Sequence, residues 1–394
     1  MPALDGMRIL DMTQYEAGTS CTQALAWMGA DVVKVEAPGL GDPGRWLAGR
    51  DDYFWNWNAN KRSVAIDLRK DEGRALLLEL LPRFDVFVEN YGPGVIERLD
   101  LEYETVKPYH PGLIYAQIKG FGLSGPYADY RAYDMTAQAA AGTFSVTGEA
   151  DGPPTLPGPT VGDSGTGVQL GMAILAAYIQ RLRTGEGQHI EISMQEALTY
   201  YMRTRIANGS DWGRASSPRS GNNLGAAPSG IYPCKPGGPN DWAFILTVTP
   251  PHVDRFYLAI DRPDLVTDER FIGDEARLAN SDLLREEIIA WTSVRTKQEV
   301  MKQLCEAGVP CAATLDTQDL FDDPHLNERG FVHEVEHPTQ GNVRMLGFPP
   351  RLSDSEVAFE PPPELGAHTD AVLSEELGWG PEKLAALREK GAIG

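Results

Sequence analysis

The sequence predicts an α/β protein in which a large domain built on a parallel sheet accompanies a smaller α+β domain. In the first half, short apolar segments alternate with helical ones. The amino-acid composition changes near Arg203, where Gly, Ser and Asn become frequent. A shorter region of strands and helices follows. Strands that alternate with helices are typical of a parallel sheet, because each connection has to cross back over the sheet.

The segments of the first half follow one another in a regular order. We expect a strand at 7–12, a helix at 17–30 and a strand at 31–36, which together form a βαβ unit. The alternation continues with strands at 63–68, 85–90, 113–121 and 187–194, helices at 72–84 and 159–182, and a helical turn at 94–99. This order predicts a Rossmann-like winding.

The second half has a different organisation. Residues 203–230 read as a linker or active-site loop. The following segments are expected to be strands at 242–248 and 309–315 and helices at 282–293 and 296–308. The tail combines a proline-rich passage with a final pair of helices.

Composition argues against several classes of function. No apolar run reaches the roughly 18 residues of a membrane span, and the first residues have no signal-peptide core, so neither a membrane nor export is expected. Four widely spaced cysteines without CxxC spacing predict no metal site and favour a reducing cytoplasm. A net charge of −21 disfavours nucleic acid as a partner.

Asp163 stands in the most informative segment, PTVGDSGTGVQLGMAILAAYIQRL, a Gly-rich turn that leads into a long apolar helix. As a helix N-cap it would complement the helix dipole. As a nucleophile it would stay ionised with a low pKa at the same place. Its small neighbours Gly162, Ser164, Gly165 and Gly167 would let an acyl group approach. The spacing leaves both interpretations open.

Two other chemistries fit this sequence poorly. GDSG also surrounds the nucleophilic serine of chymotrypsin-like proteases, but His110 is the only upstream histidine and stands in a turn. A dinucleotide site would need G-x-G-x-x-G after the first strand, whereas MTQYEAGTS contains a single glycine.

Eight segments, in order from residue 4 to about residue 370, resemble the class III CoA-transferases. This family includes formyl-CoA transferase and the carnitine CoA-transferases and is related to the α-methylacyl-CoA racemases. The segments are LDGMRILDMTQYEAGTSCTQALAWMGADVVKVE, GDPGR, NKRSVAIDL, VENYGPGVIERL, GDSGTG, RTGEGQHIEISMQEA, AGVPCAATLDTQDLFDDPHL and LGAHTD. The resemblance implies transfer of coenzyme A from an acyl-CoA to a free organic acid of small or medium size. Asp163 would be the nucleophile, through aspartyl anhydride and aspartyl-CoA intermediates, and no cofactor would be permanently bound.

The resemblance also implies roles for other residues. Tyr133 and Asp134 would adjoin the nucleophile, and Glu16 would replace an active-site glutamine, where its charge would disfavour oxalate. The implied CoA-binding residues are Ala17, Arg69, Asn90, Tyr91, Arg98 and Arg131. The implied acid pocket consists of Trp46, Tyr53, Gly225 and Ala226.

Two alternatives within the superfamily stay open. A racemase acting alpha to the thioester would need a second proton-transfer group, and Tyr133 stands where those enzymes have a histidine. A non-catalytic CoA-binding homologue would have no need to retain Asp163.

The resemblance further implies an interlocked homodimer and a division of the chain. We expect a large Rossmann-like domain at 1–202, a linker or active-site loop at 203–230 and a small α+β domain at 231–332. A C-terminal segment, 333–394, would return to the large domain. Residues 203–230 and 333–365 are expected to be long irregular linkers, as interlocking would require.

Overall fold

The computed structural model describes residues 1–222, 225 and 227–394, and these form two compact units. The first unit comprises Met1–Phe144, Leu156–Gly213 and Gly330–Gly394. The second comprises Ser145–Thr155 and Arg214–Arg329. The C-terminal segment therefore belongs to the same unit as the N-terminal half.

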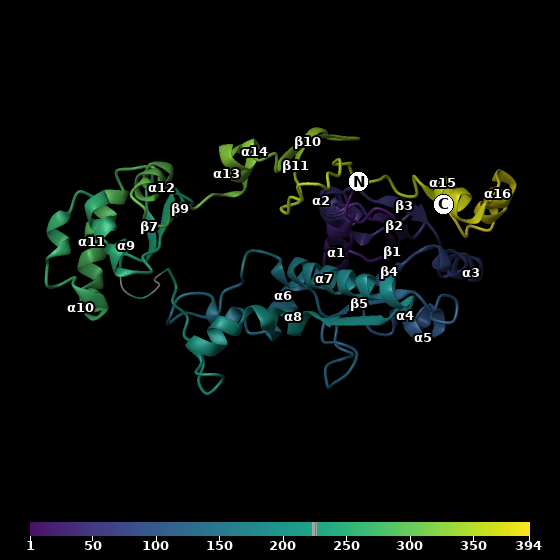
Figure 1. The fold of residues 1–394 in the computed structure, drawn as a ribbon, viewed down its shortest axis with the longest axis horizontal. Coiled ribbons are helices and arrows are strands. Elements are labelled where there is room, and N and C mark those ends of the chain that lie inside the picture. The colour runs from purple at the N-terminus through teal and green to yellow at the C-terminus, as the bar shows by residue number, and fades with distance from the viewer. Residues whose placement is uncertain (223–224, 226) are drawn as a thin grey trace. The chain divides into compact units, whose positions relative to one another are not determined.

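The first unit is built on a six-stranded parallel sheet with the strand order β3-β2-β1-β4-β5-β6 (Figure 1). The strands are β1 (Arg8–Met12), β2 (Asp31–Glu36), β3 (Arg62–Ala65), β4 (Val86–Glu89), β5 (Ile114–Lys119) and β6 (His189–Ser193). This is the order of Rossmann folds, and the winding reverses between β1 and β4. The expected parallel α/β sheet is confirmed.

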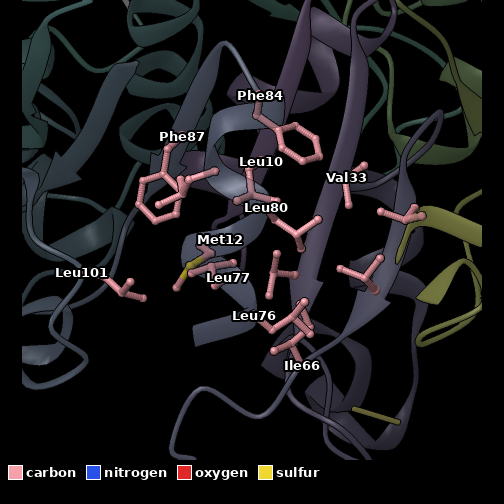
Figure 2. Packing of buried hydrophobic residues seen from close by; sticks show 14 of the residues in the cluster. Leu10, Met12, Val33, Ile66, Leu76, Leu77, Leu80, Phe84, Phe87 and Leu101 are labelled. Carbon is pink, nitrogen blue, oxygen red and sulfur yellow. The ribbon is translucent and has the colours of Figure 1, made fainter. Parts of the chain in front are cut away.

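Helices cover both faces of this sheet. They are α1 (Ala17–Ala26), α2 (Asp52–Trp57), α3 (Asp71–Leu80), α4 (Val95–Arg98), α5 (Tyr103–Val106), α6 (Asp134–Ala140), α7 (Val161–Thr184), α8 (Met194–Tyr201), α15 (Thr369–Leu377) and α16 (Pro381–Glu389). On one face, Leu10 and Val33 of the sheet pack with Leu76 and Leu80 of α3 (Figure 2). The C-terminal helices α15 and α16 join this core, and α1 and α7 pack on the opposite face.

The second unit has a three-stranded antiparallel sheet with the order β7-β8-β9. Its strands are β7 (Gly230–Pro233), β8 (Trp242–Ile245) and β9 (Cys311–Ala313). Its helices are α9 (Pro250–Ala259), α10 (Gly273–Ala279), α11 (Ser281–Thr292), α12 (Lys297–Glu306), α13 (Thr317–Asp322) and α14 (Pro324–Glu328). A separate apolar core, with Phe256 and Ile288 fully buried, stabilises this unit.

The expectation of an irregular linker over 333–365 was wrong for its first part. An antiparallel hairpin, β10 (Val332–His337) and β11 (Gly341–Leu346), occupies this segment. Along β10, exposed Glu334 and Glu336 alternate with buried Val335 and His337. This period-2 alternation is typical of a strand and was present in the sequence. Val335 packs with Trp55 of α2. In the described part of the chain, no helix has the length and apolarity needed to cross a bilayer.

Candidate active site

A cavity of about 270 Å³ opens where the winding of the sheet reverses. Three loops, which leave the carboxyl ends of β1, β4 and β5, contribute to its walls together with Asp163 of α7. Open α/β sheets bind ligands at this position, because the loops after neighbouring strands diverge to opposite faces and leave a crevice. The lining residues include Gln14, Tyr15, Ala17, Asn90, Tyr91, Ile118, Lys119, Gly120, Tyr130, Arg131, Tyr133 and Asp163.

Asp163 lies in the first turn of α7, and its residue is only 9% exposed. The N-cap of the helix is Thr160, so the interpretation of Asp163 as the N-cap was wrong. The backbone N–H of Asp163 donates to Oδ1 of Asp134 at 3.0 Å. Within the described residues, no side chain or backbone group donates a hydrogen bond to the Asp163 carboxylate. Its oxygens are therefore available to a ligand in the cavity.

The pKa of Asp163 is raised to about 7, first by burial and then by the nearby carboxyl groups of Glu16 and Asp134. The expected low pKa was therefore wrong. The positive end of a helix dipole favours the ionised form, but its effect is limited to the first turn and is smaller than the cost of desolvating a charge beside two like charges.

Glu16 is the residue before α1, and it is 1% exposed. Oγ1 of Thr160 donates to one of its carboxyl oxygens at 2.6 Å, and the hydroxyl of Tyr53 donates to the other at 3.0 Å. Burial raises the pKa of Glu16, although these two hydrogen bonds oppose the shift. Thr160 thus links Glu16 to the beginning of the helix that carries Asp163.

Asp134 and Tyr133 begin α6, and both lie next to the same site. Asp134 is buried, and its second oxygen accepts a hydrogen bond from Nε2 of Gln138 at 2.8 Å. Tyr133 lines the cavity, and its ring meets the ring of Tyr15 edge to face at a centroid distance of 6.0 Å. The exposed Tyr133 ring therefore forms part of the cavity wall.

Two of the small residues around Asp163 allow close packing of the helices. A Cβ atom on Gly167 would lie 2.1 Å from Oγ of Ser20 and 2.4 Å from the carbonyl oxygen of Ala17. A Cβ atom on Gly162 would lie 2.6 Å from Oδ1 of Asp134. The glycines let α7 approach α1 and α6 closely, and this contact brings Asp163 beside Glu16 and Asp134.

Most of the residues expected to bind CoA gather here. Ala17, Asn90, Tyr91 and Arg131 line the cavity of Asp163. The side chain of Asn90 accepts the Gln14 N–H at 2.7 Å and donates to the Gln14 carbonyl at 2.9 Å, which holds the loops after β1 and β4 together.

A second cavity of about 270 Å³ adjoins the first, and both share Gln14 and Tyr91 as lining residues. Arg69 lines this second cavity and pairs with Asp67 at 2.8 Å. Arg98 is exposed at the end of α4 and lines neither cavity.

The residues expected to form the acid pocket do not share one cavity within the first unit, and one of them belongs to the second unit. Tyr53 contacts Glu16, whereas Trp46 lines a different cavity of about 370 Å³ with Arg45 and Arg50. Gly225 belongs to the second unit. Ala226 lies outside the described residues.

Sequence reasoning missed three polar residues of the site. Thr160 holds Glu16, Gln138 holds Asp134, and Lys119 lines the cavity and pairs with the buried Glu89 at 2.8 Å. Lys119 ends β5, the strand that pairs with β4 at the reversal of the winding, so its place in the sheet order was a usable signal. The described residues contain no cluster of acidic, His or Cys side chains that could hold a metal ion.

Comparisons with known proteins agree over nearly the whole chain. Residues 4–369 match the family model described as CoA-transferase family III. A formyl-CoA:oxalate CoA-transferase of Streptomyces coelicolor is 40% identical, with 99% of each chain covered. A protein of the same description from Rhodopseudomonas palustris is 39% identical, covering 99% of this chain and 97% of the relative.

Solved structures with the same fold belong to similar proteins. A CAIB/BAIF family protein from Brucella suis has a TM-score of 0.85 and 31% identity, covering 95% of this chain and 99% of that one. Rv3272 from Mycobacterium tuberculosis has a TM-score of 0.80 and 28% identity, covering 94% and 99%.

Proposed function

This chain belongs to the class III CoA-transferase family and is a CoA-transferase, and we propose that it uses Asp163 as the nucleophile. One observation carries this proposal. Asp163 lines the cavity at the reversal of the sheet, and its carboxylate accepts no hydrogen bond from the described residues. A carboxylate that is buried and left without donors is poorly solvated, and a poorly solvated anion attacks an acyl carbon more readily.

The proposed reaction conserves the activated carboxyl group at every step. An Asp163 oxygen attacks the thioester carbon, the C–S bond breaks, and a mixed anhydride and CoA thiolate form. The thiolate then attacks the Asp163 carboxyl carbon, which releases the donor acid as its carboxylate and leaves an aspartyl-CoA thioester. The acceptor carboxylate attacks that thioester and expels the thiolate again. The thiolate finally attacks the acceptor's acyl carbon, which yields the new acyl-CoA and free Asp163.

The two adjoining cavities suggest how acyl-CoA binds as a substrate. A long ligand can pass from one cavity to the other beside Gln14 and Tyr91, which line both. The nucleotide end of CoA would occupy the cavity of Arg69, whose guanidinium suits phosphate oxygens. The thioester end would then lie in the cavity of Asp163.

Glu16 favours a monocarboxylate as the acceptor acid. The relatives are named for formyl-CoA and oxalate, and oxalate carries two negative charges. Glu16 is buried and is close enough to Asp163 to raise its pKa. A dianion that approaches this pair meets more like charge than a monoanion does, and buried like charges repel strongly.

The protein is proposed to act as a homodimer in the cytoplasm. One side of α7 exposes Val168, Met172, Ile179 and Leu182, each by at least 50%. These residues recur at helical spacing and form an apolar stripe, which a second copy of the chain would cover. All four cysteines are free thiols, as a reducing compartment would keep them.

The test is mass spectrometry of peptides after incubation with an acyl-CoA panel that includes formyl-CoA, acetyl-CoA and succinyl-CoA, followed by hydroxylamine. We expect a hydroxamate on the peptide that carries Asp163, in the wild type but not in Asp163→Ala. Ser164→Ala is the control, because it keeps Asp163 and removes only the neighbouring hydroxyl, which donates to the Thr160 carbonyl at 2.9 Å and also hydrogen-bonds to Glu16. Exchange of the α-hydrogen with deuterium oxide, without a hydroxamate, would instead indicate an isomerase.

A further inference from the structure

A buried ion pair lies beside the two cavities, and its carboxylate, Asp42, belongs to the wall of the cavity of Arg69. Nζ of Lys34, on β2, lies 2.9 Å from Oδ2 of Asp42, and their side chains are 0% and 1% exposed. Asp42 precedes a 3-10 segment, Pro43–Gly49, and its other oxygen accepts the Gly44 N–H at 2.8 Å. The Asp42 N–H donates to Glu36 at 2.9 Å, so the side chain and the backbone of Asp42 are both held in place.

This pair holds the loop after β1 at two points. Nζ of Lys34 donates to the Thr13 carbonyl at 2.6 Å, and Oδ1 of Asp42 accepts the Tyr15 N–H at 3.1 Å. The two contacts lie on either side of Gln14. Tyr15 itself has a φ of +58°, a left-handed conformation that a residue with a side chain seldom adopts unless its surroundings impose it.

The residue after Tyr15 is Glu16, followed by Ala17 in the wall of the cavity. A change in the backbone of Tyr15 would rotate the next peptide and displace the Glu16 carboxyl group from Thr160 and Tyr53. We infer that Asp42 is a positioning residue of the active site, which fixes the left-handed turn at Tyr15 and thereby holds Glu16 beside Asp163. The consequence for catalysis rests on the function proposed for Asp163, whereas the geometric consequence does not.

The neighbouring buried pair provides a contrast. Nζ of Lys61 lies 3.0 Å from Oδ2 of Asp11 and also donates to the Thr19 carbonyl and to Asn58. None of these groups belongs to Tyr15 or Glu16. The Lys61–Asp11 pair therefore connects β1, α1 and α2, whereas Asp42 holds the turn that precedes Glu16.

Two double variants test the backbone hydrogen bonds that Oδ1 of Asp42 accepts from Tyr15 and Gly44. Lys34→Met/Asp42→Asn and Lys34→Met/Asp42→Leu both remove the whole ion pair, so neither leaves a buried charge unpaired. Only the first keeps a side-chain oxygen that can accept the Tyr15 N–H. Asp85→Asn serves as a further control, because Asp85 also accepts a backbone N–H, from Arg8 at 2.8 Å, and pairs with Arg181 away from the cavity.

Crystal structures of the variants give the first readout. We expect the Glu16–Thr160 hydrogen bond to persist in Lys34→Met/Asp42→Asn and in Asp85→Asn, and to be lost in Lys34→Met/Asp42→Leu. If Tyr15 and Glu16 keep their positions in the leucine variant, the inference is wrong. This readout needs no substrate and is independent of the proposed function.

The pH dependence of kcat/KM, measured with formyl-CoA and a monocarboxylate, gives the second readout. Glu16 and Asp134 raise the pKa of Asp163, and Asp163 in turn raises the pKa of Tyr53. The other titratable or charged groups in the same cavity wall are Tyr15, Tyr91, Lys119, Tyr130, Arg131 and Tyr133. In the leucine variant we expect kcat/KM at pH 8 to fall at least tenfold and the acidic limb to move to lower pH, because Glu16 no longer opposes ionisation of Asp163. A loss of stability alone would lower kcat/KM without changing the pH at which kcat/KM falls in acid. An active Asp163→Ala, measured in parallel, would refute the proposed function and leave the crystallographic result standing.

Discussion

Replacing Asp163 by Asn should favour the folded protein increasingly as the pH rises, and should stabilise it at pH 8. Burial and two neighbouring carboxyl groups raise the pKa of Asp163 from 3.8 to about 7. A group whose pKa is higher in the folded state stabilises the protein below its unfolded pKa, and that contribution is lost as the pH rises through the folded value. At neutral pH and above, the ionised Asp163 therefore opposes folding.

The size of the effect follows from the two pKa values. Each tenfold change in an acidity constant corresponds to ~1.4 kcal/mol, so ionised Asp163 costs the fold about 4 kcal/mol above pH 7. Asn has no charge to desolvate, but burying its amide without partners costs about 1–3 kcal/mol at every pH. The cleaner quantity is the change between pH 5 and pH 8. Over this range the advantage of Asp163→Asn should grow by about 2–3 kcal/mol.

The assay is urea unfolding of both proteins at pH 5 and pH 8, followed by circular dichroism. Asp67→Asn is the control, because a hydrogen bond from Arg69 lowers the pKa of Asp67. The stability that ionised Asp67 contributes is fully present above its unfolded pKa and is lost only in stronger acid. The effect of Asp67→Asn on the free energy of unfolding should therefore be the same at pH 5 and pH 8. An equal difference between Asp163→Asn and the wild type at pH 5 and pH 8 would show that Asp163 does not carry the burial penalty inferred here.

Three further substitutions test other parts of the site. Glu16→Gln should lower the pH at which kcat/KM begins to fall in acid, since one like charge beside Asp163 is removed. For the same reason it should raise kcat/KM for oxalate about tenfold relative to a monocarboxylate. Unchanged acceptor selectivity would contradict the role of Glu16. Gly167→Ala should destabilise the protein by about 1–3 kcal/mol in thermal unfolding, because its Cβ meets Ser20 at 2.1 Å, whereas Gly171→Ala, whose Cβ meets only Cys21 at 3.9 Å, should be tolerated. Arg69→Ala should raise the KM for acyl-CoA about tenfold, as expected for a lost charge-assisted contact, and Arg98→Ala should raise it less; equal effects would argue against the cavity of Arg69 as the nucleotide site.

The sequence by itself determined the parallel α/β architecture of the large unit, and it singled out Asp163 as the proposed nucleophile. The apolar segments that became β1, α1 and β2 are local patterns, and their order allows only a few ways to wind a parallel sheet. The resemblance that singled out Asp163 is also carried by contiguous segments. The hairpin β10–β11 was not predicted, although its alternation was visible, because an interlocked dimer led us to expect an irregular linker there.

The tertiary structure alone decided the chemical state of the site. Glu16 and Asp134 reach Asp163 from other elements, and their charges, together with burial, turn an expected low pKa into a raised one. The same holds for Asp42, whose contact with Tyr15 joins residues that no sequence pattern connects. Desolvation and charge repulsion depend on distances between side chains, and those distances exist only once α1, α6 and α7 have packed together.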